Sequence, residues 1–528
     1  MTGHVFVIQG DTRRFACDAY LYATDRDLRQ NGGWMRSAPD APNRIDTAAR
    51  AEFQREKTFT LVLNDRPGID NEPATILTAV PYYRAASEPA FIPRIAEFFR
   101  VGTEIARRRG VTATASQRER PLLAIPMFGT GGGGANSIRG RMFRLIYRES
   151  QKAAREHDVD VAVVLRDPRD YALAQMIRRE KDGAWPELSA KQHAQARELG
   201  RLAQDARLVP FMGAGISISA GAPSWSALLN DLAASAGIDP DLTVALKGHD
   251  ALDQAAYIRQ EFERRFRDPR DEQDQFAAAV IRAVNVRRYG IAPPLLAALE
   301  AEQAITLNYD RLFEWAAIDG QHPRRVIPGP SAGEERWLLK LHGTVDDPSS
   351  IVLTRDDYLG FNSDRAALSS LVKATLMTRH LLFVGFGVTD PHFHEVVHDV
   401  RRAVPDRQQR FGTVLTTLEN DPVKRRLWER DLDFIHLKTP RLLDIFLDAV
   451  LAYGASSRSY LLAHGYDSAL SAADRKVSEE LRKMVSSIPV EAQTGTAWAA
   501  VSGLLTDLGW NTRSASRRSW TALPEGLE

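Results

Sequence analysis

A glycine turn at the end of an apolar run is the first segment of the chain that points to chemistry. The run LVPFM ends in Gly213-Ala214-Gly215, and Ser217 follows before a helical pattern resumes. Glycine lets a backbone approach a pyrophosphate closely, and the free N–H groups and dipole of a following helix favour its negative charge. Because a Gly-x-Gly turn is as common as a tight structural turn, this segment indicates a phosphate site only together with others.

Three further segments place polar residues or glycines at the ends of apolar runs. Each segment also has a purely structural interpretation. ITLNYD could supply a helix cap and a charge in the first turn of a helix, and LLFVGFGVTD could be a strand, a turn and a helix cap. A lone histidine such as that of LLKLHG is more often structural than catalytic. An imidazole with a pKa of about 6.5 is, however, also a good general base near pH 7. The residues that we expect to form a site with the glycine turn are Asn308, Asp310, His342, Gly385, Gly387 and Thr389.

Strand-like and helical patterns alternate around these segments, which predicts the elements that position them. Short strands separated by helices are typical of a mainly parallel sheet with helices on both faces, and such sheets place ligands at the carboxyl ends of their strands. We therefore expect the four segments to meet at one edge of a sheet. The expected strands between Leu208 and Leu437 are RLVPFMG, AITLNYD, WLLKLHG, SIVLTRDDY, HLLFVGFG, FGTVLTT and DFIHLK.

The rest of the chain predicts two further units. The first part alternates strands and helices in an α/β pattern, and a polar connector, RREKDGAWPELSAKQ, separates it from the next unit. After Pro440 the pattern is helical and ends in a basic, serine-rich segment. At roughly 150 residues per domain, the length of 528 residues agrees with three units. We predict an α/β domain over 1–179, a parallel-sheet domain over 190–440 and a helical tail over 441–528.

Composition and charge limit the classes of function. Hydrophobic residues make up 44% of the chain and charged residues 26%, which is typical of a globular protein. A formal net charge of +1 gives no electrostatic reason to expect nucleic acid or an anionic membrane as a partner. No stretch approaches the ~20 apolar residues of a membrane span, and a signal peptide is not recognisable, so we expect a cytoplasmic protein. Cys17 is the single cysteine, which excludes a cysteine-rich zinc module.

The chain resembles the sirtuin-like superfamily, and more closely its bacterial branch of defence-associated NAD hydrolases. The resemblance is carried by four motifs in the family's order: GAGIS, NYD, LHG and VGFGVTDP. The resemblance covers a little under half of the chain, and it implies a Rossmann-like sheet that binds NAD. It implies that the pyrophosphate is held by Gly213, Ala214, Gly215 and Ser217. It also implies that the adenosine ribose is bordered by Gly385, Gly387 and Thr389.

The same resemblance assigns three residues to the nicotinamide end of the ligand. Asn308 would orient the nicotinamide ribose or the attacking water, Asp310 would face the carboxamide, and His342 would be the general base. Cleavage of the nicotinamide–ribose bond passes through an oxocarbenium-like state with a neutral leaving group. It therefore needs a dry pocket, a positioned nucleophile and a base that is neutral near pH 7.

Departures from the sirtuin pattern distinguish among reactions. Sirtuin deacylases carry a four-cysteine zinc ribbon after the histidine motif, whereas the segment from Thr344 to His380 has no cysteine. APSW stands where deacylases have Pro-Asp-Phe-Arg, and Leu307 replaces a glutamine. We therefore expect NAD as substrate, no zinc, and water as acceptor, which defines an NAD glycohydrolase that yields nicotinamide and ADP-ribose. The alternatives are a module that senses NAD or ADP-ribose without cleaving it, and an ADP-ribosyltransferase or deacylase.

The first domain resembles a divergent macro domain, a fold whose relatives bind ADP-ribose. Its opening has a strand, Gly10-Asp11 and a second strand, and Gly129 to Gly134 would be a diphosphate loop. Thr24 and Asp25 stand where hydrolytic macro domains have an asparagine pair, so a nucleotide sensor and a scaffold both stay open. The resemblance to defence-associated NAD hydrolases implies an antiphage effector. Because uncontrolled NAD hydrolysis would starve the cell, we expect its activity to be gated, in a homo-oligomer or in a complex with a defence-system partner protein.

Overall fold

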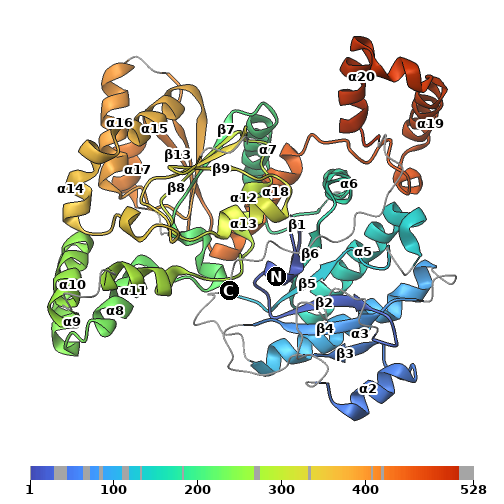
Figure 1. Cartoon of the computed structure of the whole chain (residues 1–528), viewed down its shortest axis with the longest axis horizontal. Helices are drawn as coiled ribbons and strands as arrows, with labels where there is room; N and C mark the ends of the chain where they lie inside the picture. Colours follow the sequence, from blue (N-terminus) through green and yellow to red (C-terminus); the bar gives the residue numbers. More distant parts are fainter. Residues whose placement is uncertain are drawn as a thin grey trace.

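The computed structural model shows two α/β domains, helices between them and a helical arm at one end (Figure 1). Among the residues that the structure describes, no helix is long and apolar enough to cross a bilayer. Those residues are 2–28, 45–63, 72–81, 87–109, 118–130, 134–180, 183–266, 274–330, 335–405, 408–417 and 421–510.

The first domain is built on a six-stranded sheet with the order β1-β6-β5-β2-β4-β3. Neighbouring strands are parallel, except that β3 runs antiparallel to β4. The strands are β1 (Val5–Gln9), β2 (Ala19–Thr24), β3 (Thr60–Val62), β4 (Ala74–Ala79), β5 (Leu122–Pro126) and β6 (Asp160–Leu165). The helices are α2 (Thr47–Gln54), α3 (Glu88–Arg109), α5 (Arg139–His157) and α6 (Pro168–Arg179).

The second domain is built on a seven-stranded, wholly parallel sheet with the order β13-β12-β11-β7-β8-β10-β9. The order reverses direction at β7, so the carboxyl ends of β7, β8 and β11 form the switch point where open α/β sheets bind ligands. The strands are β7 (Leu208–Met212), β8 (Gln303–Thr306), β9 (Arg325–Ile327), β10 (Trp337–Lys340), β11 (His380–Val384), β12 (Gly412–Thr416) and β13 (Leu432–His436).

Helices cover both faces of this second sheet, and alternate strand residues serve the two faces. Leu208 and Leu382 pack into one core with α7, α12, α13 and α18, whereas Val209 and Phe383 pack into another with α14, α15 and α16, as the period of two along a strand requires. The bounds are α7 (Ala190–Gln204), α12 (Ala292–Ala297), α13 (Leu312–Asp319), α14 (Arg355–Asp364), α15 (Ala366–Thr378), α16 (Pro391–Ala403), α17 (Pro422–Trp428) and α18 (Pro440–Gly454).

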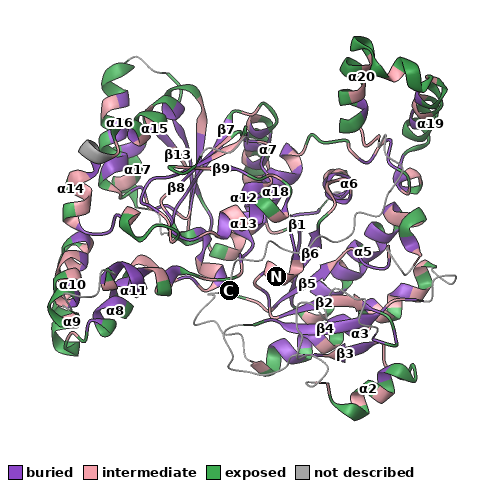
Figure 2. Ribbon diagram, in the orientation of Figure 1, coloured by how far each residue is buried: buried purple, intermediate pink, exposed green. Residues whose placement is uncertain are grey.

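Two helical parts extend from this framework. A lobe between β7 and β8 has its own core, and the arm after α18 is largely exposed, as the green surface of its two helices shows (Figure 2). The lobe contains α8 (Trp225–Ser235), α9 (Pro240–Leu246), α10 (Ala251–Arg265) and α11 (Gln275–Val284). The arm contains α19 (Ala472–Ser487) and α20 (Thr496–Asp507).

A buried charge cluster joins the first domain to α18. The carboxylate of Asp448 on α18 is wholly buried and accepts hydrogen bonds from Arg178 and from the indole N–H of Trp185 (2.8 Å), and His4 Nε2 lies 3.1 Å away. A second bridge joins Arg441 to Asp160 of β6 (2.7 Å). Because α18 also packs on α7 in the core of the second domain, this helix belongs to both domains. The predicted division at residue 440 stays a prediction, and it falls at the start of α18.

The expected fold class is confirmed as mixed α/β with parallel sheets and a helical tail, and one strand prediction is wrong. SIVLTRDDY is not a strand, because α14 begins inside it with a capping box. The Thr354 hydroxyl accepts a hydrogen bond from the N–H of Asp357, and the Asp357 carboxylate accepts one from the N–H of Thr354. The strand β9 was not among the expected strands. β9 has only three residues at the sheet edge, too few for a periodic pattern.

Candidate functional site

The two glycine turns of the site pack directly against each other at the carboxyl ends of β7 and β11. The Gly213 N–H donates to Val384 O (3.0 Å) and the Gly215 N–H to Gly385 O (3.1 Å). A Cβ added to Gly215 would lie 2.6 Å from the Cα of Gly385, so the strands can approach this closely only without side chains. Ala214 and Gly215 are nevertheless exposed beyond the strand, so the outer side of this turn is accessible from solvent.

Replacing Gly385 with alanine is expected to destabilise the protein by at least about 1 kcal/mol, because its φ of +64° is left-handed and the new Cβ would lie 2.6 Å from Ile216 N. Gly387→Ala is the matched control. Its Cβ would meet nothing closer than 3.4 Å and its φ is not left-handed, so thermal denaturation should shift little. Equal shifts for the two variants would contradict the proposed packing.

A chain of hydrogen bonds links three of the predicted residues across β7 and β8. The Asn308 side-chain amide donates to Ser217 Oγ (3.2 Å), and the Ser217 hydroxyl donates to Asp310 Oδ2 (2.9 Å). The other Asp310 oxygen accepts from the Leu312 N–H at the start of α13 (3.0 Å). All three side chains are at least nine-tenths buried. Asp310 is therefore an anchor that fixes Ser217, and Ser217 in turn orients the amide of Asn308.

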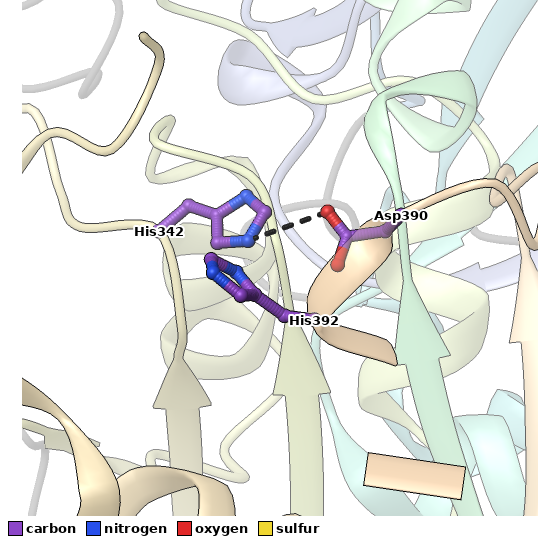
Figure 3. A group of neighbouring side chains, drawn as sticks. All are labelled: His342, Asp390 and His392. Carbon is purple, nitrogen blue, oxygen red and sulfur yellow. Dashed lines mark ion pairs between the residues drawn. The ribbon is translucent and has the colours of Figure 1, made fainter. Parts of the chain in front are cut away.

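His342 follows β10 and faces Asp390 at the start of α16 (Figure 3). Its Nε2 is buried without a hydrogen-bond partner among the described residues and lies 3.6 Å from Asp390 Oδ2. The Tyr358 hydroxyl donates to the same oxygen (2.8 Å), and Asp390 Oδ1 accepts from the Phe393 N–H as the cap of α16 (3.0 Å). The carboxylate is thus held in place from two sides beside the imidazole.

Burial sets the protonation state of His342. The side chain is 3% exposed, and burial lowers its pKa to about 4, with His392 and Arg365 adding to the effect and Asp390 opposing it. His342 is therefore a neutral imidazole at physiological pH. A neutral imidazole beside a carboxylate can take a proton and have the resulting charge stabilised.

His342, Asp390 and His392 are also a group whose ligand-type atoms lie within 4.8 Å of one another. His392 has a structural reason for its position. Its ring stacks on Tyr358 and Phe361, with centroids 4.3 and 3.9 Å apart, and its Nε2 lies 3.0 Å from Tyr358 O. We assign no metal to this cluster.

A cavity of about 500 Å³ opens at the carboxyl ends of β11, β12 and β13, and Gly387 lines it. Lys424 of α17 also lines it and donates a hydrogen bond to Gly387 O, and burial lowers the pKa of this lysine. Thr389 lies on the same turn and is exposed. The cavity is large enough for one half of a dinucleotide. Thr416, Lys424 and His436 also line it, and the sequence motifs did not indicate these three residues.

The corresponding edge of the first domain is in contact with the second domain. A Cβ on Gly10 would lie 2.7 Å from the hydroxyl of Tyr289, which accepts from the Asp11 N–H (2.9 Å) and donates to Asp319 (3.1 Å). Of the predicted diphosphate loop, Gly129 and Gly134 have left-handed φ angles, and residues 131–133 lie outside the described residues.

Residues 302–434 match the SIR2-like domain. This range contains the asparagine, histidine and second glycine motifs, so the match confirms the resemblance of this part of the second domain to sirtuin-like proteins. Among curated proteins, the chain is similar to NAD(+) hydrolase ThsA of Enterococcus faecium, 31% identical over 38% of this chain and 41% of the relative. It is also similar to NAD(+) hydrolase ThsA of Bacillus cereus, 28% identical over 43% and 49%. The chain thus spans less than half the length of these relatives.

Two comparisons are more limited. Defense-associated sirtuin 2 of Bacillus subtilis is 29% identical over 21% of this chain and 12% of that protein. The macrodomain of Oceanobacillus iheyensis is similar in structure with 16% identity and a TM-score of 0.23, covering 33% of this chain and 89% of that one. A macro-like first domain stays a prediction.

Proposed function

We propose that the protein is an NAD glycohydrolase that cleaves NAD to nicotinamide and ADP-ribose. The observation that carries this proposal is the placement of a fixed amide, Asn308, and a neutral buried imidazole, His342, at the carboxyl ends of the neighbouring strands β8 and β10, in the segment that matches a SIR2-like domain. The names of the ThsA relatives support the same reaction.

The proposed mechanism assigns one task to each residue. The backbone of Gly213 to Ser217 receives the pyrophosphate, and Asn308 orients the ribose or the attacking water. As the bond to nicotinamide breaks, the nicotinamide leaves as a neutral molecule and water attacks the ribose carbon. His342 takes the proton that the water loses, and Asp390, 3.6 Å from its Nε2, stabilises the imidazolium.

The direct test is to incubate the purified full chain with NAD and to measure nicotinamide and ADP-ribose. We expect equal amounts of the two products. NAD binding without nicotinamide release, in the presence of candidate activators such as ADP-ribose, would favour the sensing alternative. Transfer of ADP-ribose to protein would favour a transferase.

The pH dependence of this reaction should follow the lowered pKa of His342. A base must be unprotonated, so kcat/KM should fall only as pH drops through about 4, and not near the ordinary value of about 6.5. Because the pKa of this histidine is lower in the folded than in the unfolded chain, the unfolded chain takes up the proton at a higher pH. The contribution of His342 to the free energy of unfolding therefore decreases as pH falls from about 6.5 towards about 4. Circular dichroism at each pH separates unfolding from titration, and an acid limb near 6.5 in the folded protein would contradict the assignment.

We also propose that the first domain gates this activity. α13 begins directly after the catalytic turn, and its end contacts the first domain: Asp319 lies 3.1 Å from the Tyr289 hydroxyl that holds Asp11, and the Gln321 amide donates to Arg166 O (2.9 Å). A ligand or partner at that edge would therefore act on α13, whose first N–H, that of Leu312, is held by Asp310. The homo-oligomer, the defence-system partner, the antiphage role and the cytoplasmic location belong to this proposal.

A further inference from the structure

A buried lysine lies beneath the catalytic turn. Lys340 is the last residue of β10, two positions before His342, and it is 1% exposed. A buried ammonium is costly unless each of its three donors is used. Here Nζ donates to Tyr309 O (3.0 Å), to Asp310 O (2.6 Å) and to Glu314 Oε1 (2.7 Å).

Two of these acceptors are backbone carbonyls of the turn that carries Asn308. The third, Glu314, lies in the first turn of α13, so Lys340 binds both the turn and the helix that follows it. Tyr309 O also accepts from the Val345 N–H (3.0 Å) in the loop after His342. The histidine and asparagine segments therefore meet at one carbonyl, and the lysine holds that carbonyl.

Other contacts fix the side chains of the turn, and the Val345 N–H holds one of its two carbonyls. Asp310 accepts from Ser217 and Leu312 through its carboxylate, and the Tyr309 hydroxyl donates to Val352 O (2.8 Å). Lys340 is a charged donor that binds two successive carbonyls, which fixes the orientation of the peptide planes on either side. Because His342 follows the end of this strand by two residues, one element sets both the position of the base and the position of the amide.

We propose that Lys340 is a positioning residue that clamps the Asn308–Asp310 turn in its reactive geometry and sets its distance from His342. This inference rests on the proposed function, and it assigns to Lys340 no contact with the substrate.

The first test compares kcat and KM of Lys340→Met and Glu314→Gln with those of the full-length wild type. Lys340→Met keeps the length of the side chain and removes the clamp, so kcat should fall about 10- to 100-fold, the usual cost of misplacing a reacting group, with a smaller change in KM. Glu314→Gln keeps an acceptor for the ammonium and both carbonyl contacts, so kcat should fall clearly less than in Lys340→Met, while the loss of the counter-charge beside the buried ammonium should lower the melting temperature. Equal losses in the two variants, or full kcat in Lys340→Met, would overturn the proposal.

A structural control separates positioning from general stability. Leu339→Ala removes a wholly buried side chain from the opposite face of the same strand, so it should lower the melting temperature while leaving kcat within about threefold. If Lys340→Met does not fold, Lys340→Gln replaces it in the same comparison. The glutamine side chain is shorter and neutral, so it can make at most some of the three hydrogen bonds of the lysine. A Leu339→Ala variant that loses as much kcat as the lysine variants would overturn the proposal.

A second measurement does not depend on activity. Amide hydrogen exchange of the peptide from Asn308 to Leu312 should become about tenfold faster in Lys340→Met, because the local opening that exposes these amides loses a restraint. Exchange in β11 should be unchanged. Faster exchange without nicotinamide release by the wild type would support the clamp and contradict the proposed function, whereas unchanged exchange in this peptide would contradict the clamp itself.

Discussion

Alanine at Asn308 or at His342 is expected to slow nicotinamide release at least about 10²-fold, since loss of a general base typically costs about 10²–10⁴-fold in rate. Both side chains lie at the carboxyl ends of neighbouring strands, β8 and β10, and both are buried. His342 supplies the neutral nitrogen, and Asn308 supplies an amide whose orientation Ser217 fixes at 3.2 Å. The measurement is steady-state release of nicotinamide by the purified full-length variants.

A distant histidine provides the matched control for this prediction. His193 on α7 lies close to Tyr453 (3.2 Å) and Trp185 (3.1 Å) and does not contact the site. His193→Ala should therefore retain turnover, even if its melting temperature falls. Wild-type turnover in either site variant would remove that residue from the proposed mechanism, and loss of turnover in His193→Ala would show that the assay responds to stability alone.

The second large effect is expected on stability, from Asp448→Asn at the junction of the domains. Burial raises the pKa of Asp448, but Arg178 and His4 outweigh it and bring the pKa to about 2. The asparagine keeps the size of the side chain and leaves the wholly buried Arg178 guanidinium without a counter-charge. Breaking a buried pair from one side costs about 3–5 kcal/mol, so the melting temperature should fall by on the order of 10 °C.

An exposed pair is the control for this stability prediction. Glu480 lies 2.9 Å from Lys483 on α19, and both side chains are more than half exposed. Glu480→Gln should change the melting temperature little, because exposed pairs contribute about 0–1 kcal/mol. A melting temperature for Asp448→Asn that equals that of Glu480→Gln would mean that the buried cluster does not hold the domains together.

The strands that carry the site could be predicted because each is an apolar run that ends in a recognisable turn. The runs before Gly213, Asn308 and His342 are all strands whose ends meet at one edge. The spacing along the chain was enough to indicate which residues could act together, because parallel strands bring their carboxyl ends to the same edge.

The contacts between these residues could not be predicted, because they join distant parts of the chain. Asp390 lies beside His342 only because the cap of α16 faces the end of β10 (Figure 3), and its sequence reads as an ordinary helix cap. In the same way the sequence suggests two separate ligand turns, one at Gly215 for the pyrophosphate and one at Gly385 for the adenosine ribose, although each provides room for the other. The lysine of KLHG gives no signal, since a strand residue of this type is usually exposed.

The position of Asp448 also has a consequence for biosynthesis. His4 is synthesised 444 positions before its carboxylate partner, which at about 5–20 residues per second is a delay on the order of tens of seconds. Until α18 is made, the first domain exposes Arg178 and the apolar surface that this helix later covers, so we expect the nascent chain to bind chaperones during this interval. The catalytic strands are all synthesised before α18, and the docking of that helix is therefore a late step that completes both domains together.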